Sequence, residues 1–171
     1  PQIFAYLDDL SATSDLVSQE EIGRTNEGRE IRLMKVSSSN GPINKPAIWM
    51  DCGIHAREWI SPATCLWGLG YLSSQYGVNN NVTTLLDNHD LYILPVLNPD
   101  GYNYTMVEDR LWRKNRMQYS SEDCVGTDLN RNYDDGHWGG IGSSNRSCLD
   151  IYHGQIRRQK NLMFRFYYLI V

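Results

Sequence analysis

The sequence lacks an excess of basic residues. Sixteen Lys and Arg residues stand against 20 Asp and Glu residues, which gives a formal net charge of -4, and the basic residues are scattered along the chain. Nucleic-acid-binding domains carry a clustered basic patch or stripe. We therefore expect neither DNA nor RNA as a partner.

Long apolar runs are lacking as well. The apolar run at residues 162–171 contains Arg165 and is shorter than the roughly 20 residues that a membrane-spanning helix needs. We therefore expect no membrane partner. No charged-then-apolar leader opens the chain, but a leader removed on maturation would leave the same beginning, so secretion is not excluded.

The remaining composition is ordinary. Of the 171 residues, 41% are hydrophobic and 21% are charged, which is typical of a folded domain that buries a substantial core. We expect a monomer.

The chain has four cysteine residues, and these can pair in three ways. Two disulfide bonds would suit an oxidising compartment, whereas four free thiols would suit the cytosol. Three triplets fit the acceptor rule for N-glycosylation and favour a secreted, extracellular protein. They begin at Asn81, Asn103 and Asn145.

Hydrophobic periodicity predicts alternating helices and strands. The first half predicts a helix over residues 3–16, a hairpin of 21–24 with 29–36, and a strand over 47–50 that is apolar enough to be buried on both faces. Further on, Ser61 and Pro62 predict the start of a helix reaching residue 76. A short helix over 82–86, a strand over 90–97, a turn at 98–101 and a loop over 136–144 follow.

His55 and Glu58 come directly after the predicted strand at 47–50. Residues three apart lie on one face of a helical turn, so both side chains can reach one ion, and both are zinc ligands. The pattern H-x-x-E also occurs by chance, as a surface histidine beside a surface glutamate. On its own the pattern therefore does not distinguish a zinc site from a chance surface pair.

Four motifs resemble those of the zinc metallocarboxypeptidases of the carboxypeptidase A/B type, in the same order and at similar spacing. They are residues 45–67, 97–101, 110–114 and 128–132. The resemblance runs from Val17 to Gly154. It implies an α/β fold with a mixed sheet and helices on both faces. It also divides the chain into a partial catalytic domain, 1–154, and a divergent tail, 155–171.

The resemblance implies a zinc ion held by His55 and Glu58. Asp128 would bind the other ring nitrogen of His55 and fix its tautomer. The family's third ligand, a later histidine, and its glutamate general base have no counterpart here. Three other histidines remain as weak candidates for the third ligand. They are His89, His137 and His153.

The resemblance further implies removal of a C-terminal amino acid from peptides and proteins. Arg113 would stabilise the oxyanion, Asn130 and Arg131 would bind the terminal carboxylate, and Arg57 would contact a more distant subsite. Arg113 and Arg57 could instead be solvated surface charges, and Asp128 could be a loop acid. An inactive fragment, or a module that only binds peptide carboxylates, is the alternative function. The preference for basic or apolar C-terminal residues stays open.

The family's disulfide pattern implies a particular pairing of the four cysteines. Cys52 would pair with Cys65, and Cys124 with Cys148. The first pair flanks the zinc motif, as it does in the B-type members.

Overall fold

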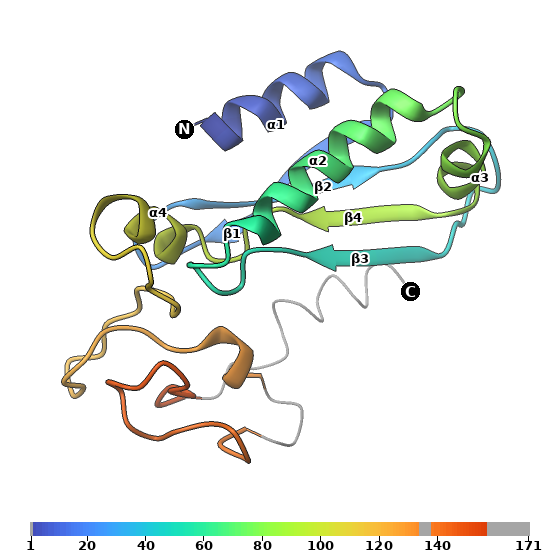
Figure 1. Cartoon of the computed structure of the whole chain (residues 1–171). Helices are drawn as coiled ribbons and strands as arrows, with labels where there is room; N and C mark the ends of the chain where they lie inside the picture. The colour runs from blue at the N-terminus through green and yellow to red at the C-terminus, as the bar shows by residue number, and fades with distance from the viewer. Residues whose placement is uncertain (1, 134–137, 157–171) are drawn as a thin grey trace. The chain divides into compact units, whose positions relative to one another are not determined.

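The computed structural model describes residues 2–133 and 138–156 (Figure 1), and the chain divides into two compact units. One, here the sheet unit, comprises residues 1–23, 30–52 and 60–97. The other, here the loop unit, comprises 24–29, 53–59 and 98–171. Residues 157–171, most of the predicted divergent tail, lie outside the described residues.

A four-stranded mixed sheet of order β1-β2-β4-β3 forms the centre of the sheet unit. Its strands are β1 (Val17–Arg24), β2 (Glu30–Val36), β3 (Ala47–Asp51) and β4 (Asp90–Leu94). Strand β4 pairs antiparallel with β2 and parallel with β3, so Ile93 lies opposite both Met34 and Met50. The predicted α/β class with a mixed sheet is confirmed, and so is the hairpin.

Helices α1 (Gln2–Thr13) and α2 (Ile60–Gln75) both lie over one face of this sheet (Figure 1). Helix α3 (Asn80–Asn88) follows α2 and is longer than the predicted 82–86. The side chain of Asn79 explains the earlier start, because it caps the helix by accepting bonds from the main-chain N–H groups of Asn81 and Val82.

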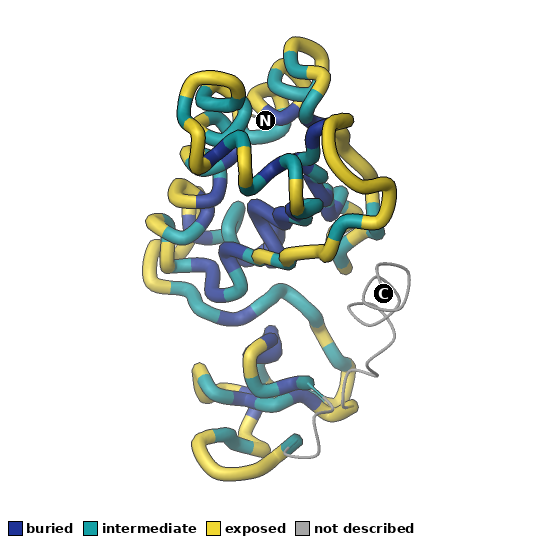
Figure 2. The backbone as a smooth tube through the Cα atoms, turned by 90° about the vertical axis from the view of Figure 1, so that its right-hand side faces the viewer, coloured by how far each residue is buried: buried dark blue, intermediate teal, exposed yellow. Residues whose placement is uncertain are grey.

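The core of the sheet unit lies between this face and the helices. Leu7 of α1, Leu69 of α2 and Leu86 of α3 are fully buried, and Met34 and Ile93 meet them from the sheet. Buried stretches appear dark blue in Figure 2. Burial of one such side chain contributes about 1.5–3 kcal/mol, so this shared core holds the helices against the sheet.

The prediction that residues 47–50 are buried on both faces was wrong. Strand β3 is at the end of the strand order, and Ile48 and Met50 expose 42% and 38% of their surface. An apolar run indicates a strand, but the number of neighbouring strands decides whether both faces are covered.

Two predicted boundaries were also wrong. Helix α2 begins at Ile60, so Ser61 lies inside the first turn and is not its cap. Strand β4 ends at Leu94, and the predicted turn at 98–101 is instead the start of helix α4 (Pro99–Val107). Asn98 caps α4 by accepting a hydrogen bond from the N–H of Gly101, and Pro99 occupies the first turn, where proline is favoured.

The loop unit contains α4, the 3₁₀ helix η1 (Leu129–Arg131) and connecting loops. A disulfide bond joins Cys124 to Cys148 in this unit, and another joins Cys52 to Cys65 in the sheet unit. This is the pairing that the family resemblance implies. Among the described residues, no helix is long and apolar enough to cross a membrane.

Candidate functional site

His55 and Glu58 lie on one tight turn of the loop unit. The N–H of Glu58 donates to the carbonyl of His55 at 3.2 Å, and this closure brings His55 Nδ1 to 2.9 Å from Glu58 Oε1. The imidazole is buried, while the Glu58 side chain is 46% exposed. The turn therefore brings together two side chains of types that can bind a metal ion, with the Glu58 side chain open to solvent.

Asp128, whose side chain is fully buried, holds the opposite nitrogen of the imidazole. Its Oδ1 lies 3.3 Å from His55 Nε2 and accepts the N–H of Asn130 at 2.9 Å. The second bond caps η1, and the N–H of Asp128 itself donates to the carbonyl of Tyr152. Two main-chain anchors thus fix the carboxylate that orients the imidazole.

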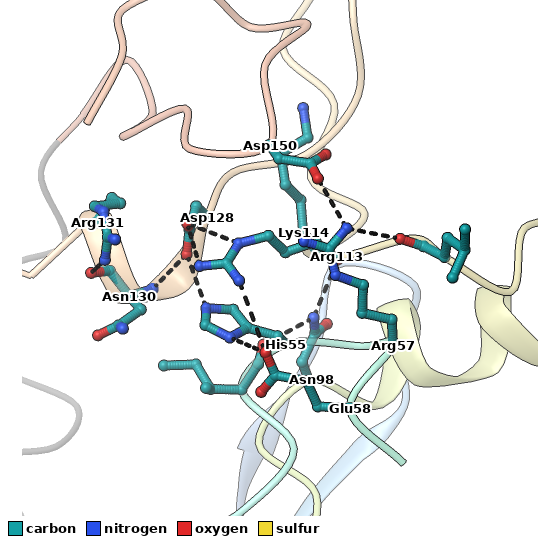
Figure 3. A network of polar contacts seen from close by, with 12 residues as sticks. His55, Arg57, Glu58, Asn98, Arg113, Lys114, Asp128, Asn130, Arg131 and Asp150 are labelled. Carbon is teal, nitrogen blue, oxygen red and sulfur yellow. Dashed lines mark hydrogen bonds and ion pairs between the residues drawn. The ribbon is translucent and has the colours of Figure 1, made fainter. Parts of the chain in front are cut away.

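Arg113 joins the same carboxylate from another side (Figure 3). Its Nε and Nη2 donate to Asp128 Oδ2 at 3.1 and 3.0 Å, and its Nη1 lies 3.7 Å from Glu58 Oε1. Burial alone would raise the pKa of Asp128, but the hydrogen bond to His55 and the positive charge of Arg113 outweigh it, so that pKa is lowered. Asp128 is therefore a buried anion shared by an imidazole and a guanidinium.

This arrangement suits a metal ion at one position. If Nε2 of His55 carries the proton and donates to Asp128, then the Nδ1 lone pair faces Glu58 Oε1. Two acceptors so close need a proton or a cation between them. From zinc–ligand bonds of 2.0–2.2 Å in a tetrahedron, two ligand atoms should lie about 3.3 Å apart. The separation in the structure is 2.9 Å.

A complete three-ligand site does not form within residues 2–133 and 138–156, where no group of three His, Cys, Asp or Glu side chains could hold an ion. His89 Nδ1 lies against the carbonyl of Leu85, and His153 Nδ1 lies against that of Gly154. His137 lies outside the described residues. The site thus fits zinc with two of the three protein ligands expected.

The Arg57 side chain donates its hydrogen bonds to residues outside the His55–Asp128–Arg113 network. Its Nη1 donates to Asp150 Oδ2 at 2.9 Å and to the carbonyl of Leu111 at 3.2 Å. The sequence carried no signal for Asp150, because the two residues lie 93 positions apart. The predicted subsite arginine is therefore half of an exposed ion pair.

Asn130 and Arg131 lie on η1, two and three residues after Asp128, which caps this helix. The Asn130 side chain is exposed, and Arg131 uses Nε on the carbonyl of Gly142 and Nη1 on that of Asn130. Two of the five N–H donors of a guanidinium are then engaged. In Figure 3 the Arg131 side chain is directed away from Arg113.

Asn98 is a positioning residue that sequence reasoning missed. It is 3% exposed, and its Nδ2 donates to the carbonyls of Ile54 and Lys114 while its N–H donates to that of Gly53. It therefore ties the His55 turn to the segment bearing Arg113. A Cβ on Gly101 would lie 2.6 Å from Asn98 Nδ2, so this packing needs glycine there.

The model of the zinc carboxypeptidase family matches residues 3–171. The chain therefore belongs to the zinc carboxypeptidase family.

Particular relatives include both the B and A types. The chain is 52% identical to human carboxypeptidase B over 139 residues, which is 81% of this chain and 33% of that protein. It is 44% identical to mouse carboxypeptidase A2 over 154 residues, which is 90% of this chain and 36% of that protein. A crystal structure of thrombin activatable fibrinolysis inhibitor superposes with a TM-score of 0.91 at 42% identity, covering 98% of this chain and 42% of the other. The chain thus spans about a third of these curated relatives.

Proposed function

We propose that this chain is part of a zinc-dependent metallocarboxypeptidase that releases the C-terminal amino acid of peptides and proteins. The observation that supports the proposal best is the buried carboxylate of Asp128, bonded to both His55 and Arg113 beside Glu58. A zinc ion bound there would supply Lewis-acid chemistry at the scissile carbonyl.

In the proposed enzyme, each of these residues has its own role. Asp128 keeps the proton on Nε2 of His55, so Nδ1 stays free to bind metal beside Glu58. Arg113 directs its guanidinium at the oxyanion that develops on the scissile carbonyl. Asn130 and Arg131 bind the terminal carboxylate, for which a planar guanidinium is well shaped. That last interaction is what would restrict cleavage to the chain end.

The metal assignment predicts weak zinc binding of about one equivalent, because the described residues offer two ligands. Zinc retained after dialysis should be measured by mass spectrometry at several zinc concentrations. The double variant His55→Ala, Glu58→Ala should lose the bound ion. His89→Ala, which removes a histidine that lies against a main-chain carbonyl, is the matched control and should retain it. Unchanged zinc binding by the double variant would refute the assignment.

The alternative, a module that binds peptide carboxylates without cleaving them, is favoured by the lack of a three-ligand group among the described residues. Both functions predict that a peptide with a free C-terminus binds more tightly than its amide. Loss of one charge-assisted hydrogen bond, about 1.5–3 kcal/mol, weakens binding about tenfold or more. Isothermal titration measures the dissociation constants of the acid and the amide. In the variant Arg131→Gln the two constants should be about equal. Equal affinities for acid and amide would exclude both functions.

We place the protein outside the cell. The two disulfide bonds support this location, because such bonds persist in oxidising compartments.

A further inference from the structure

The three N-glycosylation triplets of the sequence stand in different structural surroundings. Asn81 is exposed in the first turn of α3, Asn103 is partly buried within α4, and Asn145 is exposed in a bend. The last lies three residues before Cys148, which is disulfide-bonded to Cys124. The fold therefore distinguishes between acceptors that the sequence rule treats alike.

The surface of α3 around Asn81 is polar. Asn81, Thr84 and Asn88 are all exposed, and their spacing of three and seven residues places them on one helical face. Val82 and Leu86 are buried on the opposite face. A group attached to the Asn81 amide would extend over polar surface without displacing any core side chain.

The residues around Asn103 are more closely packed than those around Asn81. Its acceptor-rule threonine, Thr105, is 4% exposed, donates to the carbonyl of Tyr102 and accepts from the indole of Trp59. Tyr104, which lies between Asn103 and Thr105 in the sequence, packs edge-on against a tryptophan ring at 5.1 Å. Asn103 itself is partly buried whereas Asn81 is exposed, so a bulky polar group has less open surface around Asn103 than around Asn81.

We propose that Asn81 carries an N-linked oligosaccharide in the secreted protein and that Asn103 does not. Nδ2 of Asn81 forms a bond to the anomeric carbon of a lipid-diphosphate-linked oligosaccharide. The carbon–oxygen bond to the diphosphate breaks, the lipid diphosphate leaves, and the amide loses one proton to a base of the transferring enzyme. The fold then selects its products, because a group on the exposed Asn81 leaves the packing unchanged and a group on the partly buried Asn103 must displace neighbouring side chains. The proposal rests on the secreted location and is independent of peptidase activity.

The test is site occupancy in protein secreted from animal cells. Enzymatic release of N-glycans in ¹⁸O water converts each occupied Asn to a labelled Asp, which peptide mass spectrometry locates. We expect occupancy several-fold higher at Asn81 than at Asn103. The variant Asn81→Gln should lose one glycan and be secreted at an unchanged yield, because this side chain is exposed. An unlabelled Asn81, or equal labelling of Asn103, would overturn the proposal.

Translation with endoplasmic-reticulum microsomes gives a second readout that requires no secretion. With a cleavable secretion signal placed before residue 1, the chain should gain glycosidase-sensitive mass, and the Asn81→Gln variant should show one glycan fewer. If both chains shift equally, then Asn81 is not an acceptor and the proposal fails.

Discussion

Supplied with zinc, this 171-residue chain should hydrolyse a blocked dipeptide with a free carboxylate at least about 100-fold more slowly than human carboxypeptidase B. No group of three His, Cys, Asp or Glu side chains among the described residues could hold a metal ion, and both carboxylates of the network are engaged, Glu58 with His55 and Asp128 with Arg113. General-base catalysis contributes typically about 10²–10⁴-fold, and no group of the network is left to supply it. The measurement is kcat/KM for both proteins under the same conditions.

The matched control is the variant His55→Ala, purified in the same way. Turnover that survives this substitution comes from a contaminating peptidase. If the unsubstituted chain comes within about tenfold of the relative, a barrier difference of about 1.4 kcal/mol, and His55→Ala abolishes that activity, then a further residue supplies the missing ligand and base, and our expectation is wrong.

Replacing Asp128 with alanine should reduce the free energy of unfolding by about 3–5 kcal/mol, the usual cost of removing one partner from a buried ion pair. The substitution leaves the guanidinium of Arg113, whose side chain is 13% exposed, without its carboxylate, and it removes the cap of η1. Urea unfolding followed by circular dichroism measures the change.

Two variants show whether the effect belongs to this carboxylate. Asp128→Asn keeps an oxygen that can accept the N–H of Asn130, so its loss should be smaller. Asp123→Ala removes an exposed carboxylate of the same unit and should change stability by less than about 0.5 kcal/mol. A loss below about 1 kcal/mol for Asp128→Ala would contradict the described network.

Local patterns predicted much of the fold and the nearest part of the site. Alternation and apolar runs located the strands, and the spacing of His55 and Glu58 correctly predicted that their side chains meet. Helix α4 was missed because Asn-Pro-Asp-Gly suits both a turn and a capped helix start, and the six residues after Gly101 have no clear apolar periodicity to separate the two.

Contacts between distant segments could not be predicted in the same way. Asp128 lies 73 residues from His55, and only the family resemblance associated them. The bonds from Asn98 to carbonyls of two separate segments are not indicated by any local pattern, and neither is the pairing of Asp150 with Arg57. Such partners depend on how loops pack, and a single sequence does not encode that in a periodicity.

The exposed position of β3 has a consequence for handling the protein. No described strand lies on the far side of β3, and Ile48 and Met50 leave apolar surface beside that edge. An open edge of this kind invites pairing with the sheet of another molecule. Solutions of the chain will therefore be sensitive to concentration, with light scattering rising as molecules join edge to edge. A lysine at position 50 would discourage this self-association and would make the chain easier to study.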